Sequence, residues 1–332
     1  MYTGQLGIFA GMAPAPQTFS QPIDVGAAYI MPPQGRVFFV RGDGTTPTNL
    51  DDQYSSISTN MERRCYASVA AALAECKASR GDVILVGPGH TENLATANSW
   101  PFVAGVKILG LGHGSTRPTF TFTAAASTLL LNKANISIDN CVFLCAGPAG
   151  TTALTVAAPF TVSAEGCRFT RNTCEVGIDA DQLCTDFFQT TAAADNLYIA
   201  GNVITAQAAA AAITSLFTFV GCDGLQFVGN RCKAGFASAA TPLLNFATTA
   251  SLNVLVAGNF LHQWTATSTG GLTCGAVAST GWLVDNEFAT EDTAATGIAP
   301  IVLNAACLFR QNRNYVSNEK QTRGTILGTE AA

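Results

Sequence analysis

The sequence predicts an all-β fold, a parallel β-helix solenoid of about nine coils, preceded by a capping α-helix and an extended N-terminal arm. Three observations support this. Alternating apolar runs that end in Gly or Asn recur at near-even intervals, such as "LYIAGN", "LQFVGN" and "VLVAGN". Only one sustained helical period is present. The 332 residues are 48% hydrophobic and only 12% charged, which leaves few side chains for solvating a surface.

Residues 1–35 form the predicted arm. They are rich in Gly, Pro, Ala and Gln and follow neither a helical nor a strand period, so they cannot bury their apolar side chains in a core of their own. Two interpretations stand side by side: a frayed tail, or an arm that becomes ordered on a partner protein. The candidate contact residues of the arm are Leu6, Ile8, Phe9, Phe19, Ile23, Tyr29 and Ile30.

Residues 36–80 hold an entry strand and the capping helix. The strand is predicted within "GRVFFV" at 35–40. The helix is predicted over 58–79, capped by Ser58, Thr59 or Asn60 and stopped at Gly81. Its amphipathic face would cover the open end of the first coil, where unpaired strand edges otherwise invite aggregation.

Residues 81–318 form the predicted β-helix, and 319–332 a C-terminal tail. The predicted coil bends are Gly87, Gly110, Asn140, Gly166, Asn202, Asn230, Asn259, Asn286 and Asn312, at intervals of 23, 30, 26, 36, 28, 29, 27 and 26 residues. Gly adopts left-handed backbone freely and Asn better than most residues, and stacked asparagines can bond along the axis. Eight steps at strand spacing give a stack roughly 40 Å tall.

The eleven cysteines include no pair at metal-site spacing. We therefore expect all of them to be reduced core residues. A net charge of −5 and the absence of a Lys/Arg block argue against nucleic acid or an anionic membrane as a partner. The N-terminus lacks the basic region and the uninterrupted apolar run of a signal peptide.

Three stretches resemble the start of right-handed parallel β-helix proteins, of pectate-lyase-like architecture, from tailed-bacteriophage and prophage virions. They are "GRVFFV" at 35–40, "ASVAAALAECKASRGDVILVGPGHTE" at 67–92 and "VAGVKILGLGHGSTRPTFTF" at 103–122. The resemblance implies homotrimers of side-by-side solenoids. In that family some members are tailspikes or fibres and others decorate the capsid.

The sequence contains few candidate catalytic or metal-binding residues. Glycoside hydrolysis needs two carboxylates across a groove, and the acidic residues gather only in "IDADQLCTDF", with Asp179, Asp181 and Asp186. An active site, a cation site and a solvated surface loop remain open for this stretch. His90 and His113 follow successive turns and could stack, but they lack a third ligand for a metal.

The sequence therefore predicts a structural virion protein that is not an enzyme and needs no cofactor. The expected form is a homotrimeric capsid decoration or cement protein, assembled in the host cytoplasm and anchored through its arm to the major capsid protein or another virion protein. The alternative is a tailspike or tail fibre that binds or depolymerises host surface polysaccharide, using Asp179 to Asp186. A third possibility is a non-enzymatic adhesin.

Overall fold

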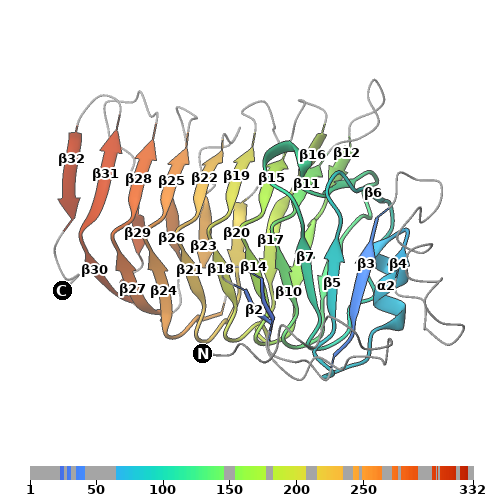
Figure 1. Ribbon diagram of the computed structural model, residues 1–332. Coiled ribbons are helices and arrows are strands. Elements are labelled where there is room, and N and C mark those ends of the chain that lie inside the picture. The colour runs from blue at the N-terminus through green and yellow to red at the C-terminus, as the bar shows by residue number, and fades with distance from the viewer. Residues whose placement is uncertain are drawn as a thin grey trace, which may run out of the picture.

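The computed structural model is a single solenoid of three parallel sheets (Figure 1). The residues that it describes are 23–25, 28–30, 35–41, 65–145, 154–176, 182–206, 215–234, 242–246, 249–263, 271–275, 278–290, 301–303, 305, 307–318 and 322–327. A complete turn of the chain supplies one strand to each sheet and is hydrogen-bonded in parallel to the turn before it. The predicted fold class, a parallel β-helix, is confirmed.

The strands of the three sheets are as follows, in chain order. Sheet 1 contains β3 (Val37–Val40), β4 (Cys65–Tyr66), β5 (Val83–Val86), β7 (Lys107–Gly110), β10 (Ser137–Asp139), β14 (Arg168–Thr170), β18 (Tyr198–Ala200), β21 (Gln226–Val228), β24 (Val254–Ala257), β27 (Thr280–Val284) and β30 (Leu308–Asn312). Sheet 2 contains β6 (Thr91–Leu94), β8 (Thr119–Phe122), β11 (Val142–Cys145), β15 (Thr173–Val176), β19 (Val203–Ala206), β22 (Arg231–Ala234), β25 (Phe260–Gln263), β28 (Glu287–Thr290), β31 (Asn314–Asn318) and β32 (Thr322–Leu327). Sheet 3 contains β9 (Leu129–Leu131), β13 (Phe160–Val162), β17 (Asp186–Thr190), β20 (Ser215–Phe219), β23 (Leu244–Phe246), β26 (Leu272–Cys274) and β29 (Ile301–Leu303).

Two short pairs lie outside these sheets. β12 (Leu154–Val156) pairs in parallel with β16 (Gln182–Cys184), and β1 (Ile23–Val25) pairs antiparallel with β2 (Ala28–Ile30). At the other end β32 runs antiparallel to β31.

The number of turns is lower than the sequence predicted. Sheet 3 has seven strands in the described part of the chain, so about seven turns contain all three strands, not nine. The first marker, Gly87, follows β5, and the last, Asn312, ends β30; in the described part of the chain neither of these turns adds a strand to sheet 3. These two markers therefore belong to incomplete turns at the ends of the solenoid.

Alternating apolar positions point into the solenoid and stack along its axis. Phe143, Phe160, Phe169, Phe188 and Phe217 are all fully buried. Neighbouring rings in this series have centroids 4.9 to 5.6 Å apart and mostly meet edge to face or tilted, arrangements that add to the free energy of burial. Burial of one large side chain per strand is the main stabilisation of such a repeat.

A second ladder is polar and lies at the first bend, between sheets 1 and 2. The backbone N–H of each ladder residue donates to the side-chain oxygen of the asparagine one turn later, at 2.8 to 3.1 Å. Each asparagine amide also donates to a backbone carbonyl of an earlier turn. The ladder comprises Cys141, Asn172, Asn202, Asn230, Asn259, Asn286 and Asn314.

Two predicted bend residues are corrected by this ladder. Asn312 ends β30 with an exposed side chain, and the buried ladder member is Asn314. Asn140 precedes the ladder position, has a φ of 56°, and donates from its side chain to the carbonyls of Gly110 and Gly112. Both errors come from the strand register. The ladder position lies two residues after the predicted Asn312, at Asn314, and one residue after the predicted Asn140, at Cys141.

The left-handed backbone also falls elsewhere than predicted. The bending residue is the one immediately before each ladder asparagine, for example Gly201, Gly229 and Gly258, with φ of 63 to 65°. The asparagines themselves are buried, do not have positive φ, and satisfy backbone groups with their side chains. Gly87 and Gly110 do not have positive φ. A Cβ on Gly110 would lie 2.3 Å from the Asn140 carbonyl oxygen, so close approach explains that glycine.

Gly166 belongs to a second bend, between sheets 3 and 1. There Gly and Asn alternate from turn to turn with positive φ, as Gly105, Asn135, Gly166, Asn196, Gly224 and Asn253. A Cβ on Gly166 would lie 2.3 Å from Oδ1 of Asn135, and one on Gly224 would lie 2.7 Å from Oδ1 of Asn196. Each asparagine side chain therefore occupies the space that the next glycine leaves empty.

The capping helix is shorter than predicted. Within the described residues it is α2 (Val69–Glu75), and Ser68 is its cap, accepting a hydrogen bond from the backbone N–H of Ala71 at 3.2 Å. Residues 58–64 lie outside the described part. Cys65 and Tyr66 form β4 instead of helix because the edge of β3 offers strand pairing, which overrides a weak helical preference.

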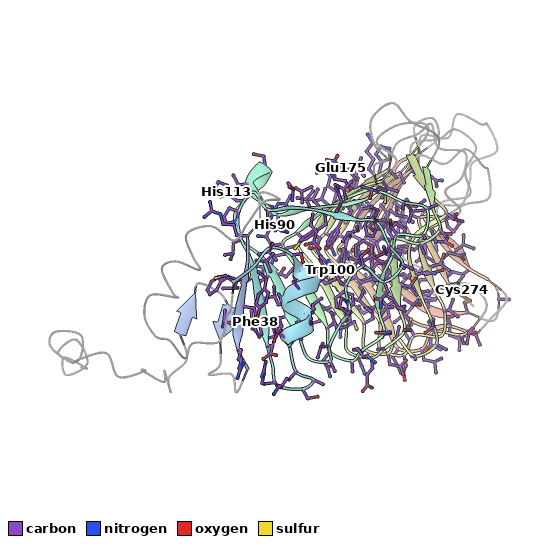
Figure 2. All side chains as sticks on the ribbon, turned by 90° about the vertical axis from the view of Figure 1, so that its right-hand side faces the viewer. Phe38, His90, Trp100, His113, Glu175 and Cys274 are labelled. Atoms are coloured by element: carbon purple, nitrogen blue, oxygen red, sulfur yellow. A yellow bond between two sulfur atoms is a disulfide. The ribbon has the colours of Figure 1, made fainter. Side chains whose placement is uncertain are left out.

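The predicted location of the helix holds. Figure 2 looks at the N-terminal end of the solenoid and shows α2 lying across it. Val69, Ala72 and Leu73 are fully buried in the core. The Glu92 carboxylate accepts a hydrogen bond from the Val69 N–H at 2.9 Å and lies 3.3 Å from Nε2 of His90. It thereby joins the start of the helix to β6.

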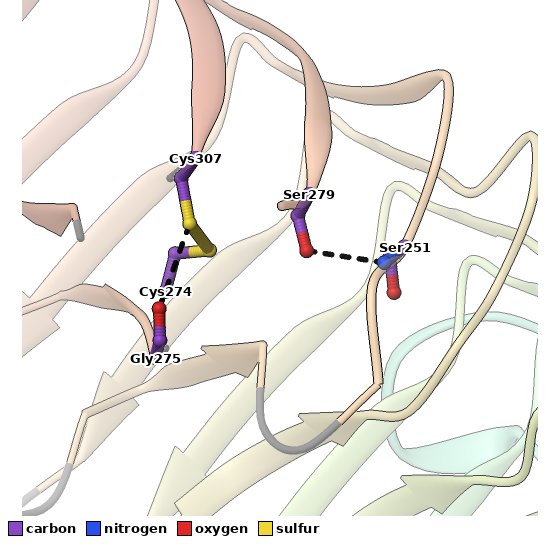
Figure 3. The surroundings of a disulfide bond; sticks show 5 residues. All are labelled: Ser251, Cys274, Gly275, Ser279 and Cys307. Atoms are coloured by element: carbon purple, nitrogen blue, oxygen red, sulfur yellow. Dashed lines mark hydrogen bonds between the residues drawn. A yellow bond between two sulfur atoms is a disulfide. The ribbon is translucent and has the colours of Figure 1, made fainter. Parts of the chain in front are cut away.

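The expectation that every cysteine is reduced was wrong for one pair. Cys274 at the end of β26 and Cys307 before β30 form a disulfide between successive turns, with Cα atoms 6.8 Å apart (Figure 3). The nine other cysteines are free and buried. Desolvation raises the pKa of the Cys222 thiol to about 11 and that of Cys76 to about 12. They behave as small apolar core residues.

Candidate functional site

A groove of about 520 Å³ opens on the outer face of sheet 1, over the last three strands, β24, β27 and β30. Two rows of outward-facing residues form its walls. One row is Asn253, Thr280 and Leu308, and the other lies two residues further along, as Leu255, Trp282 and Arg310, so the groove follows from strand alternation repeated in register. The lining residues are Asn253, Val254, Leu255, Thr280, Gly281, Trp282, Leu308 and Arg310.

Gly281 makes the floor of the groove. It pairs with Val254, and a Cβ at this position would lie only 2.2 Å from the Val254 carbonyl oxygen. Real Cβ atoms do not approach backbone oxygens so closely, so a side chain here would push β27 away from β24. The glycine therefore allows β27 to pair closely with β24 beneath the groove.

Large apolar side chains are exposed along these walls. Trp282 is 47% exposed and Leu308 is 68% exposed, while most large apolar side chains of the described chain are buried. Trp100, by contrast, is fully buried under the capping helix. Exposed aromatic and leucine side chains that share one groove are typical of a binding surface.

One positive charge lies at the groove. The guanidinium carbon of Arg310 is 5.1 Å from the centroid of the Trp282 ring, within the range of a cation–π interaction. Arg310 is the one charged residue among those that line the groove. The opposite end is polar: the Asn253 N–H donates to Oγ1 of Thr280 at 3.1 Å, and the Asn253 amide donates to Asp223 at 2.8 Å.

The groove is suited to binding. It combines apolar walls, a polar end and a single cation, and none of its lining residues is an acid or a histidine. In the part of the chain that the structure describes, no group of three His, Cys, Asp or Glu side chains is arranged to hold a metal ion.

The acidic stretch is only partly described. Asp179 and Asp181 lie outside the described residues. Asp186 starts β17 on the outer side of sheet 3, where its carboxylate accepts a hydrogen bond from Oγ1 of Thr218 at 3.1 Å. Burial raises the pKa of Asp186, and the hydrogen bonds from Thr218 and the Ser215 backbone offset part of that effect.

The remaining predicted positions are located as follows. Leu6, Ile8, Phe9 and Phe19 lie outside the described residues. Ile23, Tyr29 and Ile30 belong to the hairpin of β1 and β2, whose backbone alone is described.

The two histidines do not form a common site. His90 is buried beside Glu92. His113 is exposed at the start of the short 3-10 helix η2 (Gly114–Thr116).

The groove was missed in the sequence because its residues lie in three different repeats. Leu255, Trp282 and Arg310 are separated by 27 and 28 residues and meet only through the parallel register. An alignment of the repeats on their ladder asparagines would have placed them in one column. The isolated tryptophan in "GWLVDN" gave no such signal by itself.

Comparison with known proteins adds the following. No protein-family model and no curated protein matches the chain. Among solved structures it is similar to a rhamnogalacturonan lyase, with 12% identity, a TM-score of 0.36, and coverage of 88% of this chain and 90% of the other. It is also similar to the A-module of the Azotobacter vinelandii mannuronan C-5 epimerase AlgE6, with 10% identity, a TM-score of 0.27, and coverage of 76% and 95%. At these scores the likeness says nothing about what this chain binds.

None of the described helices has the length and apolar character needed to cross a bilayer.

Proposed function

We propose that this chain is a structural protein of a tailed-phage particle, a homotrimeric β-helix that decorates the capsid and is anchored through its N-terminal arm. Two observations support the proposal. Residues 35–122 resemble the start of phage β-helix proteins, and the outer face of sheet 3 has the character of a surface that packs against identical copies. The second observation is the one that supports a homotrimer.

The outer face of sheet 3 presents one row of side chains that contains no charged member, although the Asp186 carboxylate at the start of β17 accepts a hydrogen bond from Thr218 of this row. Parallel pairing aligns one outward residue from each strand, and Nε2 of Gln189 donates to Oγ1 of Thr161 at 3.0 Å within the row. The members with described side chains are Leu130, Thr161, Gln189, Thr218, Asn245 and Thr273. All six are partly buried already.

The outward rows of the other two sheets are charged. Sheet 1 carries Lys107, Arg168 and Arg310 in one column, and sheet 2 carries Arg231 and Glu287. Burying such charges in an interface costs several kcal/mol per unpaired ion, whereas Thr, Asn and Gln can bond to their own counterparts across a symmetry axis. Sheet 3 is therefore the face that we assign to the trimer interface.

A charge introduced into the neutral row tests this assignment. Thr273→Glu would place three carboxylates in one interface, and we expect the trimer, with three times the 34.4 kDa mass of the chain, to dissociate at micromolar concentration. Sedimentation velocity measures the mass directly. Thr205→Glu, on the outer face of sheet 2, is the matched control and should remain trimeric. A trimeric Thr273→Glu protein would contradict the assignment of sheet 3.

Removal of the arm tests the anchoring. Deleting residues 1–30 should leave a folded trimer that no longer binds to capsids, because the apolar side chains of the arm supply the contact area. Cosedimentation with expanded shells measures occupancy, and cryo-electron microscopy of the particle locates the protein. Full occupancy by the truncated protein would contradict the anchoring role. Attachment to the tail, with release of oligosaccharides from host polysaccharide, would identify the tailspike alternative.

A further inference from the structure

We propose that the edge of β30, where the groove over β24, β27 and β30 ends, is a docking site for a polypeptide segment of a partner protein, which adds there as a strand and presents an Asp or Glu to Arg310. The site is on sheet 1 and not on the sheet 3 face. The inference rests on the proposed function as a component of the particle. It describes a second contact with a partner protein, in addition to the contact made by the arm.

The first step concerns charge. Three arginines of the described chain have carboxylate partners: Arg80 with Asp82, Arg171 with Asp139, and Arg313 with Asp285. Among the described residues, Arg310 has no carboxylate partner, and its neighbour is the indole of Trp282. A guanidinium that is held in place by an aromatic ring, with its N–H groups unused, fits a carboxylate in bidentate geometry.

The second step separates a peptide from a sugar. Platforms for sugars offer the free face of an aromatic ring. Trp282 lies in register between Leu255 and Arg310, and the guanidinium lies over one face of the ring. With one ring face occupied by the guanidinium, the rest of the exposed indole and the exposed Leu308 in the same groove suit an apolar side chain better than a pyranose ring.

The third step concerns the backbone. β30 is the last strand of sheet 1 in the described part of the chain, and β27 pairs with only one of its edges. Among the described residues no strand pairs with the other edge of β30, and its backbone donors and acceptors suit β-strand addition, a mode in which main-chain hydrogen bonds supply affinity and alternate side chains supply specificity. Continuation of the Trp282–Arg310 column places the carboxylate of the added strand next to Arg310.

The experiment uses the full-length protein and an array of immobilised 12-residue peptides of randomised sequence. Bound peptides should be enriched in Asp or Glu two residues from a large apolar residue. The best peptide and its Asn/Gln copy are then titrated by fluorescence anisotropy, and the copy should bind at least roughly tenfold more weakly, as for loss of one charged hydrogen bond. Arg310→Gln should weaken the acidic peptide by a similar factor.

A matched control distinguishes the groove from arginine–aromatic stacking in general. Arg168 lies over Tyr198 at 4.6 Å on the same face but outside the groove, so Arg168→Gln should leave binding unchanged. Circular dichroism melts verify that both variants fold. The trimer mass and the capsid occupancy of Arg310→Gln are measured in parallel. They test the proposed function independently of peptide binding at the groove.

Four results would overturn the inference. The first is the absence of any acidic enrichment among the bound peptides, and the second is equal affinity of wild type and Arg310→Gln for the acidic peptide. The third is tighter binding of oligogalacturonate than of any peptide, if that binding is lost in Trp282→Ala. The fourth is a tenfold gain in peptide affinity on deletion of residues 328–332, which would identify the chain's own tail as the occupant.

Discussion

Replacement of Asn230 by Ala is expected to lower the free energy of unfolding by about 4 kcal/mol. The side chain is buried, accepts from the backbone N–H and the amide of Asn202 at 3.0 and 2.9 Å, and donates to the carbonyl of Ile199 at 3.0 Å. Alanine would leave the Asn202 N–H buried without a partner and would remove one hydrogen bond each from the Ile199 carbonyl and the Asn259 side-chain oxygen. The orphaned N–H costs about 1 to 3 kcal/mol, and each lost hydrogen bond costs about 1 kcal/mol more. Urea denaturation followed by circular dichroism measures the change.

Asn312→Ala is the matched control for this prediction. Asn312 is also an asparagine near the first bend, but its side chain is exposed at the end of β30. The change in the free energy of unfolding should stay within about 0.5 kcal/mol. Equal effects of the two substitutions would show that the ladder does not stabilise the solenoid through its buried hydrogen bonds.

Replacement of Asp82 by Asn is expected to cost about 3 kcal/mol. Asp82 is fully buried and accepts from Nε and a terminal nitrogen of Arg80 at 2.6 and 2.7 Å, and from the backbone N–H groups of Arg36 and Lys77 at 2.8 Å each. One carboxylate thus connects three segments: the start of the entry strand β3, the residues after α2, and the start of β5. The amide has one acceptor oxygen instead of two and turns a donor toward the guanidinium.

The pH dependence of this effect has a definite sign. Burial by itself would raise the pKa of Asp82, but the hydrogen bonds from Arg80, Arg36 and Lys77 outweigh it and hold the pKa below its ordinary value. A carboxylate with a lowered folded pKa stabilises the fold above its unfolded pKa, about 3.9, and this stabilisation is lost as the pH falls through the folded value. The difference between wild type and Asp82→Asn should therefore be constant near neutrality and narrow below about pH 4.

Asp285→Asn provides the comparison. The Asp285–Arg313 pair is exposed on both sides, and exposed pairs contribute less than about 1 kcal/mol. The free energy of unfolding of the protein should change little on this substitution at any pH. A cost for Asp82→Asn no larger than that for Asp285→Asn would contradict the role assigned to the buried carboxylate.

The sequence by itself determined the repeat and therefore the fold. Apolar alternation sets which side chains face inward, and a period near 28 residues with Asn or Gly at its end leaves few architectures other than a solenoid. The stacked asparagines Asn202, Asn230 and Asn259 could be recognised because they are spaced evenly and close a strand each time. These are local properties that any one repeat displays.

Tertiary structure decided everything that depends on register between turns. A shift of one or two residues is invisible in a spacing of about 28, yet it decides that Asn314 and not Asn312 joins the ladder, and that Gly229 and not Asn230 bends the chain. The same register brings Cys307 to Cys274 and Arg310 to Trp282. Such pairs are distant in the chain, and only the hydrogen-bonded stacking of successive turns fixes which side chains become neighbours.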